Sequence, residues 1–478
     1  MSTDGAHGTS PLRERAAWRV LDGFGGSVRS LSRSVAPTTV DDMAAVFAAA
    51  RAEGLKVSFR GAGRSYGDAS LNTGGLAVDA RAMRRILSFD REQGVLEAEG
   101  GASIADVWRH TLPQGWWPAV VPGTMFPTLA GCVGMNIHGK NCFKVGPFGD
   151  HVLELDLLTA SGERLTLGRE RDAELFRSVI AGLGLLGAVT RVKLKLKHVD
   201  SGQMRVRPLV AKSLAHMFEI FVERIPDSDY LVGWLDCFAT GPVLGRGLVH
   251  QAHHLSLAED PKGAETLALA RQDLPPSIMG VPKSLLWMFM QPFANDFGTK
   301  WVNAVKYALP ERVESDGTYR DSHAGFAFLL DYVPNWRRMY GEDGFIQVQL
   351  FVPDANAREA FADALRLCQR RGVVSYLGVF KRHRVDDYLL SHGLDGWSLA
   401  LDFKVPHDAK RLWDTAADLT KLVLDAGGTY YPAKDQVVDA GSFARAYGER
   451  LVRFRELQRR VDPGGLFVND QARRLGIV

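Results

Sequence analysis

The sequence has few cysteines and no pattern that would build a metal site or a disulfide framework. Four cysteines occur among 478 residues, and no two of them form a Cys-x-x-Cys pair. We therefore expect no metal ion and no disulfide scaffold. Since free thiols persist where glutathione keeps them reduced, four scattered cysteines favour a reducing compartment.

Long apolar runs and a leader sequence are also missing. No uninterrupted apolar stretch approaches the ~18 residues that a membrane-spanning helix needs. The N-terminal stretch carries Arg13, Glu14, Arg15 and Arg19 and has no apolar core segment, so we expect no secretory signal peptide. These absences predict a cytoplasmic or peripherally membrane-associated protein.

An excess of charge of one sign is absent as well. The formal net charge is +3, from 58 basic and 55 acidic side chains. Nucleic-acid-binding proteins have a stronger basic excess, so we expect no nucleic-acid partner. The 46% hydrophobic and 24% charged residues are typical of a globular protein. At about 100–200 residues per domain, the length predicts two or three domains.

The first half of the chain alternates helix and strand signals around a glycine-rich loop. Thr39 and Asp42 form a capping box that predicts a helix over residues 38–54. The further elements expected are strands at 56–59, 76–79 and 94–99, a helix at 103–112, and strands at 153–159 and 188–197. The last strand alternates apolar with basic residues, which predicts a solvated basic face. Residues 116–149 have no clean period, and a long irregular stretch of this kind is usually functional.

The second half contains two similar strand–helix–strand units. The expected elements are a strand at 345–351, a helix to 371 and a strand at 373–380, then a strand at 397–404, a helix to 425 and a strand from 429. We expect Asp354 and Asp408 to cap the starts of the two helices, and a glycine to end each. Two tandem units predict a four-stranded sheet with helices on one face, in a domain distinct from the first.

The loop at residues 60–68 reads Arg-Gly-Ala-Gly-Arg-Ser-Tyr-Gly-Asp. The spacing of Gly61, Gly63 and Gly67 differs from the dinucleotide fingerprint, and no helix pattern follows, so this is not a Rossmann site. Glycines let consecutive backbone amides approach a phosphate closely, and two arginines add positive charge. The loop therefore fits a pyrophosphate, with a plain tight turn as the alternative.

Two further polar sites stand out. His138 is flanked by Asn, Gly and Lys, which are residue types of loops and polar sites, although a single histidine is more often structural. Tyr431, Lys434 and Asp435 lie together where an expected strand ends. A lysine there can hold a developing anion or simply face solvent.

Five motifs occur in the order found in one group of flavoproteins. They are residues 60–68, 122–124, 137–141, 148–152 and 433–435. Together they resemble the vanillyl-alcohol-oxidase-type flavoproteins, which carry a PCMH-type FAD-binding domain. Within that group they are most similar to the decaprenylphosphoryl-β-D-ribose oxidase family, the flavoprotein subunits of a 2-epimerase. Residues 461–463 and 470–475 match the same family, so the resemblance covers the chain from about Gly23 to Leu475.

This resemblance implies an α+β fold with a two-segment FAD-binding domain and a cap domain whose β-sheet carries helices on one face. The implied segments are an N-terminal extension at 1–30, the PCMH-type FAD-binding domain at 31–200, the substrate cap at 201–424, and a C-terminal segment at 425–478 that returns to the FAD domain. Relatives with covalent FAD carry a histidine in the first glycine loop, where this sequence has Arg64. The FAD is therefore expected to be non-covalent.

The resemblance also implies roles for individual residues. The expected cofactor contacts are Arg60, Gly61, Ala62, Gly63, Arg64, Ser65, Tyr66, Gly67, Asp68, Gly123, Thr128, Leu129, Ala130, Gly131, Met135, Asn136, Ile137, His138, Val189 and Tyr431. The expected substrate contacts are Lys140, Gln347, Gln349, Lys381 and Lys434. Lys434 would stabilise negative charge near N1 of the flavin. The base that takes the hydroxyl proton stays open among His138, Tyr66 and Lys434.

The implied reaction is the FAD-dependent oxidation of a sugar hydroxyl, most closely C2 of a polyprenylphosphoryl ribose, to the 2-keto sugar. This would be the first half of an epimerisation toward a cell-wall arabinan precursor, completed by a separate short-chain NAD(P)H reductase. The family's cap tyrosine, asparagine and cysteine fall on Ala327, Ser398 and Ala400, so the substrate pocket is altered. Two alternatives stay open: a soluble alditol or aldonolactone oxidase that uses oxygen, and a non-catalytic flavin-binding scaffold.

Residues 275–293 allow two interpretations. An apolar run at 285–290 follows Lys283 and is bounded by Pro282 and Pro292. Such a run is usually a buried core segment. The alternative is a membrane-contacting flap that admits a lipid tail.

Overall fold

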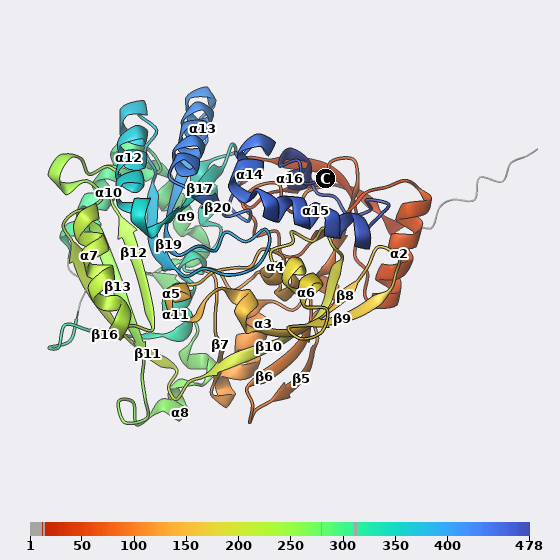
Figure 1. Ribbon diagram of the computed structural model, residues 1–478. Helices are drawn as coiled ribbons and strands as arrows, with labels where there is room; N and C mark the ends of the chain where they lie inside the picture. The colour runs from red at the N-terminus through yellow and green to blue at the C-terminus, as the bar shows by residue number, and fades with distance from the viewer. Residues whose placement is uncertain (1–11, 13–14, 279, 310–312) are drawn as a thin grey trace, which may run out of the picture.

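A computed structural model describes residues 12, 15–278, 280–309 and 313–478 of the chain. The fold is α+β, as predicted. Three principal β-sheets and the helices packed on them form the molecule (Figure 1). The largest sheet lies on the left of that view, and the two smaller sheets lie on the right under the C-terminal helices. Parts of the predicted N-terminal extension, residues 1–11 and 13–14, lie outside the described residues.

The first sheet has four strands in the order β1-β2-β4-β3. Its elements are β1 (Ala17–Asp22), β2 (Arg29–Val35), α2 (Val40–Ala52), β3 (Val57–Arg60) and β4 (Leu76–Asp79). The predicted cap of α2 is confirmed, because the Thr39 hydroxyl accepts the Asp42 amide at 3.0 Å. Strands β3 and β4 are parallel, so the glycine loop leaves β3 at the carboxyl edge of this sheet.

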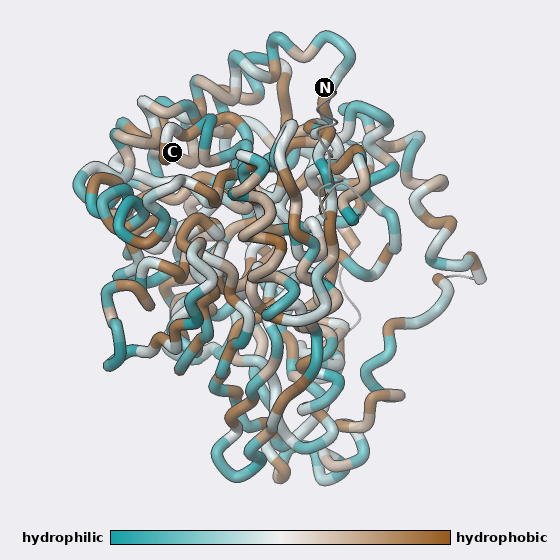
Figure 2. The backbone as a smooth tube through the Cα atoms, turned by 90° about the vertical axis from the view of Figure 1, so that its right-hand side faces the viewer, coloured by the Kyte–Doolittle hydropathy of each residue, from teal (hydrophilic) through white to brown (hydrophobic). Residues whose placement is uncertain are grey.

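The second sheet is antiparallel and is built around the long strand β10. Its elements are β5 (Ile86–Asp90), β6 (Val95–Glu99), α3 (Ile104–Thr111), β7 (Trp116–Pro118), α4 (Leu129–Gly134), α5 (Cys142–Val145), β8 (Val152–Leu158), β9 (Arg164–Gly168), α6 (Ala173–Val179) and β10 (Ala188–His198). Burial alternates along β10, as predicted. The basic face is not simply solvated, because Arg191 pairs with Glu97, Glu154 and Asp156 of the neighbouring strands. Figure 2 shows hydrophilic and hydrophobic colours alternating along the chain in the lower part of the molecule.

The third sheet has eight strands in the order β16-β11-β13-β12-β18-β19-β17-β20, rather than the four that were predicted. The strands are β11 (Gln203–Ala211), β12 (Tyr230–Leu235), β13 (Gly247–His254), β16 (Tyr319–Ser322), β17 (Phe345–Pro353), β18 (Leu377–His383), β19 (Gly396–Lys404) and β20 (Thr429–Tyr430). The two predicted units supply the last four strands and interlock: β19 lies between β17 and β18, and β17 lies between β19 and β20. Helices α7 (Leu214–Arg224), α12 (Asp354–Arg371) and α13 (Lys410–Asp425) pack on one face.

The predicted aspartate caps of α12 and α13 are wrong. Strand β17 runs through Pro353, which takes the cap position, and Asp354 is already the first helical residue. The Asp354 carboxylate instead accepts the indole N–H of Trp397. Helix α13 begins after Ala409 without a side-chain cap. The glycine stop of α12 is confirmed, since Gly372 has φ +62°.

The described residues between 255 and 340 cross the open side of the large sheet in short elements. They are α8 (Gly263–Thr266), β14 (Ser277–Ile278), β15 (Val281–Pro282), α9 (Leu286–Met290), α10 (Asp296–Ala308) and α11 (His323–Ala327). No residue of α9 is buried, so the interpretation of 275–293 as a core segment is wrong. Among the described residues, no helix is long and apolar enough to cross a bilayer.

The chain ends in three helices, α14 (Ala440–Tyr447), α15 (Glu449–Val461) and α16 (Asp470–Arg474), which lie against the first two sheets (Figure 1). Phe467 lies between α15 and α16 in the sequence and forms an isolated β-bridge with Val57 of β3. The Phe467 ring also packs 5.2 Å from the rings of Phe47 and Phe59. The last segment therefore contributes to the core under the glycine loop.

Candidate FAD and substrate site

A cavity of about 690 Å³ lies between the glycine loop, the irregular stretch before β8 and the face of the large sheet opposite α7, α12 and α13. A smaller cavity of about 90 Å³ continues it toward β10. The two share Phe59, Gly61, Thr128, Gly131 and Met135 in their linings. Together they form one elongated site that begins at Val189 and ends against β12.

The glycine loop is shaped as an anion cradle at the junction of the two cavities. Gly63 has φ +61°, and a Cβ there would lie 2.5 Å from the Arg60 guanidinium. A Cβ on Gly61 would lie 2.3 Å from the Thr128 hydroxyl. No backbone carbonyl of the described residues accepts an amide of residues 61–65. These amides are available to a phosphate, which is how such nests bind anions.

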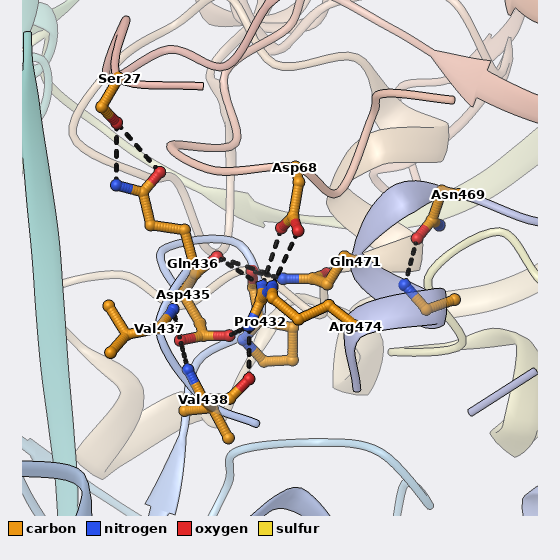
Figure 3. Close-up of polar contacts among 11 residues, drawn as sticks. Ser27, Asp68, Pro432, Asp435, Gln436, Val437, Val438, Asn469, Gln471 and Arg474 are labelled. Carbon is orange, nitrogen blue, oxygen red and sulfur yellow. Dashed lines mark hydrogen bonds and ion pairs between the residues drawn. The ribbon is translucent and has the colours of Figure 1, made fainter. Parts of the chain in front are cut away.

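A buried ion network fixes the end of this loop (Figure 3). Arg474 of α16 donates to both carboxylate oxygens of Asp68, each at 2.8 Å, and to the Asp435 carboxylate at 2.9 Å. The Arg474 guanidinium also donates to the Val438 carbonyl at 2.6 Å. Three motifs that are far apart in the sequence therefore meet at one arginine. The Asp68 side chain faces this network and does not line either cavity.

One wall of the large cavity is a row of side chains on the central strands of the third sheet. Gln347 and Gln349 project from β17, Lys381 from β18 and Ala400 from β19. Antiparallel pairing places Gln349 opposite Ala400, and Ala400 opposite Val379. Because side chains alternate along strands, Ile346, Val348 and Leu350 point the other way, into the core under the helices.

His138 meets this wall from the loop before α5. Its Nε2 lies 3.1 Å from the Gln349 amide nitrogen, and its Nδ1 lies 3.4 Å from Lys381 Nζ. The Gln349 amide also donates to Ser398 at 3.3 Å, and His383 lies 2.8 Å from the same hydroxyl. Burial, together with nearby Lys381, holds the pKa of His138 well below its usual range, so the ring is neutral at pH 7.

The charged side chains that line the large cavity are all cationic: Arg64, Lys140, Lys306, Lys381 and Lys434. No aspartate or glutamate occurs among the described residues of this lining. Burial lowers the pKa of Lys140 to about 7 and that of Lys381 to about 8. An anionic ligand would reverse both shifts, because an opposite charge favours the protonated amine.

Lys434 lies between the glycine loop and the sheet. Its Nζ is 3.4 Å from the centroid of the Tyr66 ring. Burial lowers the pKa of Lys434, and the carboxylate of Asp402 opposes that shift. Asp402 is itself buried beside Gln347, whose amide donates to one carboxylate oxygen, and its second oxygen has no hydrogen-bond partner. Burial raises the pKa of Asp402.

The structure brings most of the predicted site residues to the cavities. Those that line one or both are Arg60, Gly61, Ala62, Gly63, Arg64, Ser65, Tyr66, Gly123, Thr128, Ala130, Gly131, Met135, Ile137, His138, Lys140, Val189, Gln347, Gln349, Lys381, Tyr431 and Lys434. Four lie behind the lining: Gly67, Asp68, Leu129 and Asn136. Asn136, at φ +42°, donates to Asp386 and Ser391 and accepts the Gly149 amide.

Several side chains of the site were not singled out from the sequence. His383 and His392 pack with His138, at ring separations of 5.0 and 5.3 Å. Asp402 was also missed. No local pattern marks these residues, and the pairing of β18 with β19 brings them to the site. Ala327 and Ala400, where the resemblance places a tyrosine and a cysteine of the family, both line the cavity.

The site fits FAD. The amides of the glycine loop suit the pyrophosphate, the narrow cavity at Val189 suits the adenine end, and the wide cavity beside Tyr431 and Lys434 suits the isoalloxazine ring. Residues that would hold the dinucleotide therefore lie in one continuous groove.

Comparisons with known proteins agree with this geometry. Residues 32–168 match the family model described as an FAD binding domain. The chain is 32% identical to a decaprenylphosphoryl-β-D-ribose oxidase of Mycolicibacterium smegmatis over 440 residues, which cover 91% of this chain and 92% of that protein. It is 34% identical to cytokinin dehydrogenase 7 of rice, Oryza sativa subsp. japonica, over 37% of this chain and 35% of that protein. The chain belongs to the PCMH-type family of FAD-binding oxidoreductases.

Proposed function

We propose that the protein oxidises a secondary hydroxyl of a polyprenylphosphoryl sugar, with C2 of a polyprenylphosphoryl ribose as the preferred position. The observation that carries this proposal is the charge of the cavity. Five cations and no carboxylate line it among the described residues, beside an apolar remainder. A phosphorylated sugar with an apolar tail matches both properties. The end-to-end similarity to the Mycolicibacterium oxidase supports the same substrate class.

The residues take complementary roles in this reaction. Bound FAD would supply the hydride acceptor for the alcohol carbon. Lys381 and Gln349 hydrogen-bond the sugar, while Lys140 binds the phosphate. Lys434 stabilises negative charge next to the flavin, and its position beside Tyr66 supports that role.

His138 accepts the hydroxyl proton in this proposal. Burial raises the pKa of Tyr66 well above its usual range, so that hydroxyl stays protonated. The neutral His138 ring has one nitrogen lone pair, which faces the Gln349 amide or Lys381 and can accept a proton. The lysines beside His138 disfavour its protonated form, and the charge of a bound phosphate would offset their effect.

The product of this reaction is a keto sugar, so a second enzyme must reduce it to complete an epimerisation. We propose a separate short-chain NAD(P)H reductase as that partner. Oxidation of free alditols or aldonolactones by oxygen is less well supported, because uncharged substrates would leave Lys140 and Lys381 without a counter-charge. A non-catalytic scaffold would have no use for the row of polar side chains facing the flavin groove.

The test is anaerobic bleaching of the flavin absorbance. Short-chain polyprenylphosphoryl ribose is compared with the matched unphosphorylated polyprenyl riboside, free ribose and alditols. We expect bleaching by the phosphorylated compound, at least 100-fold faster than by the unphosphorylated one, and loss of that preference in Lys140→Met. Equal bleaching by free polyols would assign the protein to the alditol oxidases. Absence of bleaching by every compound, with FAD bound, would overturn the substrate assignment.

A further inference from the structure

Helix α10 has its polarity reversed relative to a helix on the surface of a globular protein. Such helices bury their apolar stripe and expose polar residues. Here the buried positions are Gly298, Thr299 and Asn303. The exposed positions include Phe297, at 83% of its full accessible surface, and Trp301, at 55%. The apolar side of this helix therefore faces away from the protein.

The preceding helix α9 extends the same surface. No residue of α9 is buried, and Phe289 is 62% exposed. Phe293 joins the two helices by stacking on Trp301, with ring centroids 6.0 Å apart. The exposed large side chains of α9, α10 and the short turns on either side of α9, here called the apolar face, are Leu285, Met288, Phe289, Met290, Phe293, Phe297, Trp301 and Val302. A contiguous group of this size usually marks an interaction site.

The apolar face borders the substrate cavity. Met290, at the end of α9, and Lys306, on α10, both line that cavity. Leu329 also lines it and is 56% exposed. The same two helices therefore present aromatic side chains outward and contribute residues to the site within. A tail leaving the cavity between them would emerge at the apolar face.

The charge of this segment suits the lipid–water interface. Of the three lysines in residues 281–309, Lys283 is buried, while Lys300 and Lys306 are exposed, and the segment has one acidic residue, Asp296. The Asp296 carboxylate accepts the Tyr376 hydroxyl at 3.0 Å, so it is engaged with the protein. Interfacial helices combine basic residues with Trp, Phe and Leu in this way.

We propose that the apolar face inserts into the boundary between headgroups and acyl chains of a lipid bilayer and places the cavity mouth at the membrane surface. The role of the docked cavity, drawing a lipid-linked sugar out of the bilayer, rests on the proposed function. The docking itself does not, because it follows from α9 and α10 alone. A second copy of the chain or an apolar protein partner would cover the same residues without needing the lysines.

The experiment is flotation of the FAD-loaded full chain with phosphatidylcholine vesicles, with and without phosphatidylglycerol, in the absence of substrate. We expect the protein to float with both and more strongly with the anionic vesicles. The variant Phe289→Ser/Phe297→Ser should lose at least 10-fold in vesicle affinity. The matched control Val222→Ser/Val452→Ser, which removes two exposed valines from α7 and α15, should float like the wild type.

Two results would overturn the proposal. One is a wild type that stays in the bulk with both vesicle types. The other is a Phe289→Ser/Phe297→Ser variant that floats like the control. Sedimentation velocity tests the competing occupant. If the wild type is a dimer and the Phe289→Ser/Phe297→Ser variant is a monomer, the apolar face binds a second copy of the chain. Since vesicle binding is measured without substrate, failure of the flavin-bleaching test would leave this result standing, and the reverse also holds.

Discussion

Lys434 Nζ lies 3.4 Å from the centre of the Tyr66 ring, so the glycine loop and the C-terminal segment meet at a cation–π contact inside the cavity. The ring gives the ammonium group a partner that adds no negative charge to the site. The buried carboxylate of Asp402 raises the pKa of Lys434. Tyr66 and Asp402 therefore stabilise the charge of Lys434, while its ammonium group also lines the cavity, where a ligand can reach it.

Replacing Lys434 with methionine should lower the two-electron reduction potential of the bound flavin. Removing a cation beside the ring disfavours the more negatively charged reduced form. We expect a fall of about 30–60 mV, equivalent to about 1.4–2.8 kcal/mol. Anaerobic dye equilibration measures it. Lys434→Arg should keep most of the potential, and Lys421→Met, at an exposed position on α13, should keep all of it. An unchanged potential in Lys434→Met would place Lys434 away from the flavin.

Asp402→Asn should make flavin reduction more sensitive to alkaline pH. Burial and Lys381 lower the pKa of Lys434, while the Asp402 carboxylate raises it. Without that carboxylate the pKa of Lys434 falls further, so the cation is lost at a lower pH. The other groups near Asp402 are Gln347, Tyr66, Tyr340 and Cys237, none of which supplies a negative charge at neutral pH.

We expect the alkaline limb of the reduction rate in Asp402→Asn to shift by about one pH unit toward acid, equivalent to about 1.4 kcal/mol. Stopped-flow reduction across pH 6–10, at saturating substrate, measures the shift. Asp395→Asn, an exposed change on the loop before β19, serves as the control and should match the wild type. If the rate falls equally at every pH and the alkaline limb does not shift, Asp402 contributes to packing and not to the pKa of Lys434.

Arg474→Met should destabilise the fold and loosen the cofactor. The substitution leaves the carboxylates of Asp68 and Asp435 buried without their shared cation. Breaking a buried pair by removing one partner costs about 3–5 kcal/mol. Urea unfolding of the FAD-loaded protein measures the loss. The control Arg453→Met, on α15, removes an exposed pair with Glu174 and should cost about 0–1 kcal/mol. Equal effects of the two variants would contradict the network.

Local structure was predictable from the sequence where the signal was local. The Thr39 cap predicted α2, alternation predicted the burial of β10, and Gly372 ended α12 as expected. The aspartate caps failed because β17 continues through Pro353, which leaves Asp354 inside the helix. A capping residue and a first-turn residue have similar compositions, so sequence alone does not separate them.

The motifs of the candidate site were predictable from the sequence, but the row of side chains on β17, β18 and β19 that forms one wall of the cavity was not. The glycine loop, His138 and Lys434 lie at recognisable motifs. The network from His138 through Gln349 and Ser398 to His383 depends on β19 lying between β17 and β18. Periodicity predicts which residues share a face of one strand, but not which strands are neighbours. The four additional strands of the large sheet were missed for the same reason.

Asp386 accepts a hydrogen bond from the Asn136 side chain behind the flavin groove. Burial raises the pKa of Asp386 to about 6, although the Ser391 hydroxyl donates to its carboxylate at 2.7 Å. In the unfolded chain an aspartate has a pKa of about 3.9. Between these values the folded state binds more protons than the unfolded state. The free energy of unfolding therefore falls as pH rises from about 4 to 6, and the loss is complete above the folded pKa.

Asp386→Asn removes this titration while keeping an acceptor for Asn136. Relative to the variant, the wild type should lose about 2 kcal/mol of unfolding free energy between pH 4 and pH 7, because the pKa differs by about two units at 1.36 kcal/mol each and the unfolded aspartate is already about half protonated at pH 4. Urea unfolding at both pH values measures the difference, which is independent of any constant cost of the substitution. Asp387→Asn, on the exposed neighbour that pairs with Arg177, should follow the wild type at both pH values. Parallel pH profiles for wild type and Asp386→Asn would mean that the carboxyl titrates alike in the folded and unfolded chain, and that Asn136 is held by an ordinary carboxylate.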